Sequence, residues 1–131
     1  MASMMGAAGA EGPIERFGIY VAVADLDRAQ QFYERLFGKK PTLRNESIVT
    51  FDVMGGLYAA FAAQQLDRKL TRGDNSVPYL RVKDIDAEFA RLQGMGVNVL
   101  DAAVVSEGPI KLFRFTDPDG NLLEFYSFTV R

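Results

Sequence analysis

The stretch Val23-Ala24-Asp25-Leu26-Asp27 occurs again, 59 residues later, as Val82-Lys83-Asp84-Ile85-Asp86. Each copy ends an apolar run of strand type and leads into residues with helical spacing, and its aspartates are suited to cap the helix that follows. A second similarity, now at an offset of 64 residues, links residues 51–61 with residues 115–125. We therefore interpret the chain as a tandem duplication of one structural unit.

Each half has the same predicted order of elements, one strand, one helix and three strands. In the first half these lie at residues 17–23, 25–37, from 43 onward, 47–53 and 57–63, with a turn at Met54-Gly55-Gly56. In the second half they lie at residues 77–82, 84–94, 97–105, 110–115 and 122–128, with a tight turn at Asp117-Pro118-Asp119-Gly120. The predicted fold class is α+β, built from two tandem β-α-β-β-β modules.

The expected organisation is one domain over residues 14–131, with module one at 14–63, a linker at 64–76 and module two at 77–131. The linker is rich in charged residues, which is typical of a solvated loop. Residues 1–13 are small and glycine-rich, and we expect them to be a disordered leader or a cloning remnant outside the fold.

Composition excludes several function classes. The formal charge of -2 supplies no basic surface for a nucleic acid, and no apolar run is long enough to span a membrane. The chain has no cysteine and no histidine, so it has no disulfide, no thiolate nucleophile and no Ser-His or Cys-His pair. We expect a protein of the reducing cytoplasm.

Two motifs resemble those of the vicinal oxygen chelate superfamily. They are the Asp-Leu-Asp-Arg-x-x-x-Phe-Tyr-x-x-Leu-Phe-Gly sequence at residues 25–38 and the Asp-Pro-Asp-Gly-Asn-Leu-Leu-Glu-Phe sequence at residues 117–125. This family includes glyoxalase I, extradiol dioxygenases, fosfomycin-modifying enzymes and bleomycin-binding resistance proteins. The resemblance covers about residues 17–128 and implies two modules whose curved sheets form a cleft, commonly within a homodimer. It does not imply one activity.

The resemblance also implies a metal site in that cleft, with ligands from the first and last strand of each module. The corresponding positions here are Gly18, Ala60, Val77 and Glu124. Three of these four side chains cannot bind a cation, and a catalytic site needs three or four protein ligands. We therefore expect no metal and no cofactor.

Side chains of a strand alternate between its two faces, so one assigned position assigns the whole strand. If the family's ligand positions face the cleft, so do four of the five tyrosines: Tyr20, Tyr58, Tyr79 and Tyr126. Tyrosine combines a flat apolar ring with a polar tip, which suits a pocket for a planar or amphipathic molecule. The alternative is that these tyrosines line a half-exposed sheet or a dimer interface.

The same alternation places three charged side chains in the cleft, Glu124, Arg81 and Arg114. A carboxylate among apolar neighbours can have a raised pKa and act as a proton-transfer base, which makes Glu124 the candidate catalytic residue. A salt bridge to either arginine would instead keep Glu124 ionised and inert. The arginines could also bind an anionic ligand.

Three functions remain open. The leading hypothesis is a metal-free, homodimeric protein that binds a small organic molecule, by analogy with the bleomycin-type antibiotic-resistance proteins of the similar family. The second is a metal-independent lyase or isomerase that uses Glu124 as its base. The third is a non-catalytic dimerisation domain. The sequence does not identify the ligand.

Overall fold

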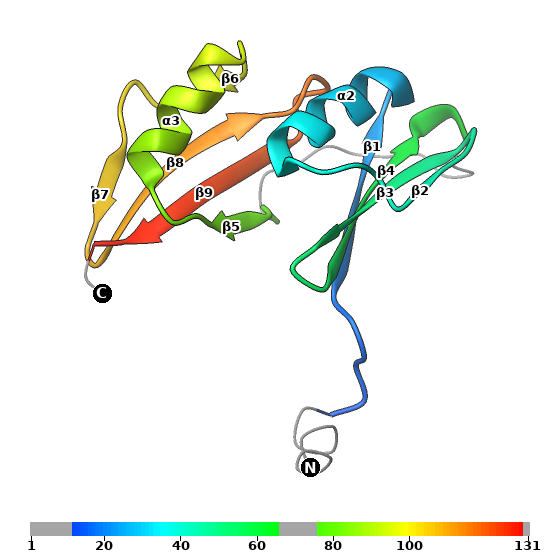
Figure 1. The fold of residues 1–131 in the computed structure, drawn as a ribbon, viewed down its shortest axis with the longest axis horizontal. Helices are drawn as coiled ribbons and strands as arrows, with labels where there is room; N and C mark the ends of the chain where they lie inside the picture. The colour runs from blue at the N-terminus through cyan, green and yellow to red at the C-terminus, as the bar shows by residue number, and fades with distance from the viewer. Residues whose placement is uncertain (1–11, 66–75, 130–131) are drawn as a thin grey trace.

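The computed structural model describes residues 12–65 and 76–129 (Figure 1). Most of the predicted leader and most of the predicted linker therefore lie outside the described residues. The described chain folds as two similar halves that lie side by side, each with one helix against one sheet (Figure 1).

The first half follows the predicted order. Its elements are β1 (Gly18–Val23), α2 (Leu26–Phe37), β2 (Leu43–Arg44), β3 (Ile48–Val53), β4 (Gly56–Ala62) and the short helix η1 (Ala63–Gln65). They form a four-stranded sheet in the order β1-β4-β3-β2, in which β1 and β4 are parallel. The first and last strands of the half are thus neighbours, and β1 lies at an edge.

The second half repeats this arrangement. Its elements are β5 (Tyr79–Arg81), α3 (Ile85–Gly94), β6 (Asn98–Val99), β7 (Val105–Glu107), β8 (Ile110–Thr116) and β9 (Leu122–Phe128). The sheet order is β5-β9-β8-β6, with β7 also paired to β8, and β5 runs parallel to β9. The predicted α+β fold with two β-α-β-β-β modules is therefore confirmed.

One predicted strand is divided. Residues 97–105 were expected to be continuous, but the chain leaves the sheet after β6 and rejoins it at β7. The cause is Asp101, whose carboxylate accepts the backbone N–H of Arg114 on β8 at 2.7 Å. A side chain thereby takes the place of a backbone carbonyl in the ladder, and the strand is interrupted.

Both helices begin with the aspartate of the repeated motif. Asp25 accepts the backbone N–H of Arg28 at 3.1 Å, and Asp84 accepts that of Ala87 at 3.0 Å. Gly38 ends α2 with φ at 68°, a conformation that glycine adopts at little cost. The duplicated sequence thus produces duplicated helix caps.

The core lies between each helix and its sheet. In the first half, aromatic rings of α2, β3 and β4 pack together: Tyr33, Phe37, Phe51 and Tyr58. In the second half, Phe89 of α3 contacts the ring of Phe113 on β8, and the ring of Phe125 on β9 packs against those of Phe113 and Phe115. We call the sheet surface against the helix the helix face, and the opposite surface the open face.

The two halves are joined mainly by the turn between β8 and β9. Asp117 accepts the hydroxyl of Tyr33 at 2.7 Å, and Asp119 accepts the backbone N–H of Ala24 at 2.9 Å. Asn121 donates to the carbonyl of Ala22 at 3.2 Å. A turn in the second half therefore contacts β1 and α2 of the first, and these contacts fix how the halves lie relative to each other.

A further join comes from α3. The guanidinium of Arg91 donates to the carbonyls of Arg35 and Leu36, at 2.9 and 3.1 Å, where α2 leaves its last carbonyls without helical partners.

No helix among the described residues is long and apolar enough to cross a membrane.

Candidate functional site

Side-chain alternation correctly assigns β1 and β3. Tyr20 lies on the open face of the first sheet, 47% exposed, with its ring 5.0 Å from that of Phe61. Thr50 of β3 pairs with Ala59 of β4, and Tyr20 pairs with the same Ala59, so these residues share the open face. Phe51 lies on the helix face, as predicted.

The prediction for Tyr58 is wrong. Tyr58 is 3% exposed and lies on the helix face of β4, where its hydroxyl is 3.1 Å from that of Tyr33. Ala60 and Ala62 lie on the helix face with it, while Leu57, Ala59 and Phe61 take the open face. Burial raises the pKa of both tyrosine hydroxyls, so they act as neutral hydrogen-bonding groups within the core.

The error has a physical cause in the two hairpin turns. In the first half Phe51 pairs with Tyr58, whereas in the second Phe115 pairs with Leu123, so the second hairpin contains one more residue. The sequence offset of 64 residues therefore holds for β3 and β8 but becomes 65 for β4 and β9. Because side chains alternate with period two, this single residue moves every side chain of β4 to the other face.

In the second half the predicted residues do come together. Tyr79 of β5 and Tyr126 of β9 lie with ring centres 5.2 Å apart, and Tyr126 contacts Phe128 edge-on at 6.0 Å. The guanidinium carbon of Arg81 lies 4.5 Å from the ring centre of Phe128, a cation–π contact. These four residues form what we call the aromatic cluster. Tyr79 is 65% exposed, which leaves the cluster open to a ligand or partner.

Glu124 lies beside this cluster, directly opposite Tyr79 on the neighbouring strand. Among residues 12–65 and 76–129, no basic side chain forms an ion pair with its carboxylate. Arg114 is instead committed to Asp101, which its guanidinium meets at 3.0 Å. Burial raises the pKa of the Glu124 carboxyl, and the nearby charge of Arg114 opposes that rise without cancelling it. The geometry therefore disfavours the alternative in which a salt bridge keeps Glu124 ionised and inert.

The residues do not fit a divalent metal of the family type. In the corrected register the fourth ligand position is Ala59, not Ala60, and like Gly18 and Val77 it has no ligating atom. Within residues 12–65 and 76–129, no three His, Cys, Asp or Glu side chains come together in a ligating group. Glu124 alone cannot form a catalytic metal site.

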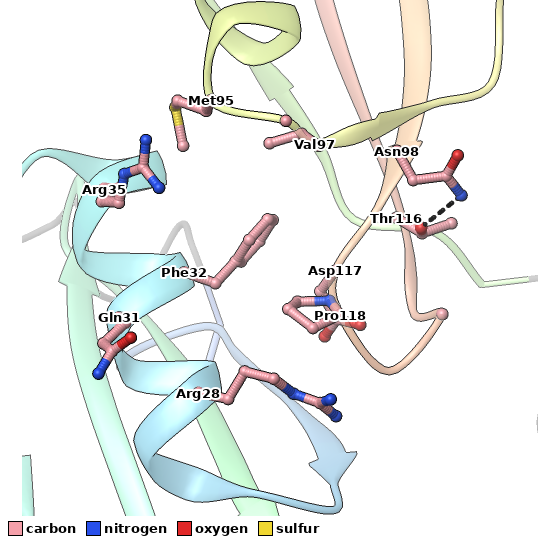
Figure 2. A pocket seen from close by; sticks show the side chains of 12 residues that line it. Arg28, Gln31, Phe32, Arg35, Met95, Val97, Asn98, Thr116, Asp117 and Pro118 are labelled. Atoms are coloured by element: carbon pink, nitrogen blue, oxygen red, sulfur yellow. Dashed lines mark hydrogen bonds between the residues drawn. The ribbon is translucent and has the colours of Figure 1, made fainter.

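Two grooves lie between the two halves. A mostly apolar groove of about 300 Å³ lies where β5 meets the first half, and Tyr79, Phe17 and Leu57 are among the residues that line it. A larger groove of about 530 Å³ lies between α2 and the second half (Figure 2). None of the predicted site residues lines the larger groove.

Comparison with known proteins decides the family. The sequence model of the glyoxalase/bleomycin resistance protein/dioxygenase superfamily matches residues 14–125. The chain belongs to this superfamily. It is 30% identical over 116 residues to a protein described as metallothiol transferase FosB from Lysinibacillus sphaericus (strain C3-41), an alignment that covers 84% of this chain and 79% of that protein.

Solved structures of this superfamily share the fold. A glyoxalase-related enzyme from Fulvimarina pelagi superposes with a TM-score of 0.76 at 22% identity, covering 88% of this chain and 89% of that one. Lactoylglutathione lyase from Agrobacterium tumefaciens superposes with a TM-score of 0.72 at 19% identity, covering 88% and 95%. At such low identity these similarities show the superfamily fold and no particular activity.

Sequence reasoning missed two residues of this site. Phe128 follows Glu124 and Tyr126 at period two, so extending the alternation by one step would have placed it beside them. Asp101 carries no such signal, because its role depends on a carboxylate that reaches across to Arg114. No local pattern predicts a contact between residues so placed.

Proposed function

We propose that this chain is a small-molecule-binding member of the superfamily that works without a bound metal. The observation that carries the proposal is the aromatic cluster of Tyr79, Arg81, Tyr126 and Phe128 on the open face of the second sheet. A cluster of aromatic rings beside a guanidinium suits a planar, amphipathic molecule, which packs against the rings while the polar tips orient it.

The metal-free part of the proposal rests on side-chain chemistry. The relative FosB is described as a metallothiol transferase, but Gly18, Val77 and Ala59 leave this chain one carboxylate at the family's metal positions. Elemental analysis of the purified protein tests this directly. We expect no stoichiometric zinc, nickel, iron or manganese, and about one tightly held metal per chain would contradict the proposal.

We further propose that two copies form the binding cleft together. The strands β1 and β5 each lie at an edge of their sheet, where unpaired backbone groups remain available. Large side chains near these edges are exposed, including Phe17 at 80%. A second copy that covers these edges would bury the apolar surface and enclose the aromatic cluster. The lack of cysteine suits such a protein to the cytoplasm.

Native mass spectrometry of the purified protein is the first test of ligand binding. We expect a co-purifying small molecule, or else binding of planar compounds from a screen, to be weakened by the changes Tyr79→Ala and Tyr126→Ala. The matched control is Tyr58→Phe, because Tyr58 lies in the core and should not affect affinity. Equal loss of binding in all three variants would show that the cluster is not the site.

One observation favours an enzyme as the second candidate. Glu124 has a raised pKa and no described ion pair, which are properties of a general base. In a lyase or isomerase of this kind, Glu124 would take a proton, and an arginine or a tyrosine would stabilise the negative charge that develops. Once a ligand is known, Glu124→Gln separates the two candidates, because a base is needed for turnover and not for binding.

A further inference from the structure

The larger groove lies between α2 of the first half and the segment that follows α3 in the second, about 530 Å³ in volume. Figure 2 shows Phe32 projecting from α2 into the space, with Met95 and Val97 across from it and Pro118 at the strand end. The groove shares no residue with the aromatic cluster. Its volume falls within the range of small-molecule sites.

The lining combines an apolar floor with polar edges. Phe32, Met95, Val97 and Pro118 supply the apolar surface. On one side, the amide of Asn98 donates to the hydroxyl of Thr116 at 3.0 Å (Figure 2). On the other side, α2 places two guanidinium groups, Arg28 and Arg35, two helical turns apart along the groove.

The charges in the groove favour a single negative charge on the ligand. Arg28 is already paired with Asp119 at 3.3 Å, and the Asp119 side chain is only 5% exposed. Arg35 is exposed, and within residues 12–65 and 76–129 the structure describes no ion pair for its guanidinium. One arginine is therefore compensated within the protein, and the other is left for an anion.

Asp117 limits how much negative charge the groove accepts. It is buried, and its two carboxylate oxygens accept four hydrogen bonds, from Tyr33, from the side chain of Asn121 and from the backbone N–H groups of Asp119 and Asn121. These donors satisfy its lone pairs but leave its charge in the wall of the groove. Because Coulomb repulsion scales with the charge of the ligand, Asp117 repels a dianion in this groove more strongly than a monoanion.

We propose that this groove is a second binding site, which takes a small monocarboxylate with an aromatic or branched apolar body. The carboxylate pairs with Arg35 in bidentate fashion, and the apolar body lies on Phe32 between α2 and Met95. Because the groove lies between the two halves, a bound molecule contacts both of them. The site is separate from the open face of the second sheet, so it does not depend on the ligand proposed there.

The chain carries its own reporters for this site. Met95 lines the groove, whereas Met54 lies 98% exposed in the turn between β3 and β4. With methionine methyl groups labelled with carbon-13, the Met95 resonance is assigned through Met95→Leu and followed by NMR as phenylacetate is added. We expect a saturable shift of Met95, an unchanged Met54, and a much smaller effect from the neutral amide phenylacetamide.

Variants and a dianion complete the test. We expect Arg35→Gln to weaken phenylacetate binding by about tenfold, as the loss of a charge-assisted bidentate pair implies. Lys40→Gln on the exposed segment after α2 should leave binding unchanged. Phenylphosphonate should bind less tightly than phenylacetate at a pH where it carries two charges. Thermal unfolding confirms that each variant is folded.

Several outcomes would overturn the inference. A Met95 resonance that does not move, that moves equally with the amide, or that moves equally in Arg35→Gln would each show that no carboxylate site exists at Arg35. Tighter binding of the phosphonate would contradict the monoanion assignment. A Met95 shift that follows protein concentration in place of phenylacetate would show that a second copy of the chain occupies the groove.

Discussion

At the scale of single residues, Glu124 is expected to destabilise the fold when it is ionised. Burial raises the pKa of its carboxyl above the unfolded value, so the folded state holds the proton more tightly. This contribution to stability is present at low pH and is lost as the pH rises from the unfolded pKa through the raised folded pKa. We expect Glu124→Gln to have a thermal midpoint equal to or higher than that of the wild type at neutral pH.

The pH dependence supplies the control for that prediction. At a pH below both values Glu124 is protonated and resembles glutamine, so the two proteins should unfold at nearly the same temperature. The difference should then grow in favour of Glu124→Gln as the pH rises through the raised pKa, which differential scanning calorimetry measures. A lower midpoint for Glu124→Gln at neutral pH would instead indicate an ion pair that Glu124 needs.

The buried hydroxyls of Tyr33 and Tyr58 should contribute unequally to stability. The Tyr33 hydroxyl donates to the buried carboxylate of Asp117 at 2.7 Å, whereas the hydroxyl of Tyr58 lies 3.1 Å from that of Tyr33, a neutral partner. Hydrogen bonds to charged groups are the stronger kind, so we expect Tyr33→Phe to cost about 2 kcal/mol and Tyr58→Phe about 1 kcal/mol in urea unfolding. A larger cost for Tyr58→Phe would contradict the assigned hydrogen-bond directions.

At the scale of elements, the sequence predicts most of this fold because helix caps and strand alternation are local. The aspartates at residues 25 and 84, the two helices and the final hairpin of each half follow from spacing alone. The face of β4 does not, because it depends on whether a turn has one residue more or less. The number of residues in the turn decides on which face of the sheet Tyr58 lies. It is read from the pairing of Phe51 with Tyr58 across the hairpin.

The first hairpin turn offers a way to test the register. Met54 and Gly55 form a two-residue turn with φ of 50° and 85°, which is the left-handed conformation at both positions. Asparagine tolerates this conformation better than methionine, and the Met54 side chain is 98% exposed, so its removal costs little packing. We expect Met54→Asn to stabilise the protein by up to about 1 kcal/mol in thermal unfolding.

The matched change Met54→Val should act in the opposite direction. Valine is branched at Cβ and is disfavoured at positive φ, so it should lower the thermal midpoint although no contact is lost. If both variants unfolded at the wild-type temperature, residue 54 would not be in the left-handed conformation. The turn of the first hairpin would then not lie at residues 54 and 55.

At the scale of the whole molecule, the site could be predicted only in part. The aromatic cluster follows from alternation on β5 and β9, whose register is correct. The contacts that join the halves do not, because Asp117, Asp119 and Asn121 have the composition of an ordinary turn. The sequence has no local sign that these side chains contact β1 and α2, because the contacts join residues 84 to 99 positions apart in the chain.

These joins hold the halves together through the helices and the turn, while Tyr20 and Tyr79 stay exposed on the open faces. The proposed dimer would cover both tyrosines, so a charge at either position should be costly only when the second copy binds. We expect the wild type to sediment as a dimer at micromolar concentration and both Tyr20→Asp and Tyr79→Asp to shift toward monomer. Met54→Asp, in the exposed turn, is the control and should remain dimeric. A wild-type monomer, or equal dissociation in all three variants, would contradict the proposal that a second copy of the chain covers the open faces.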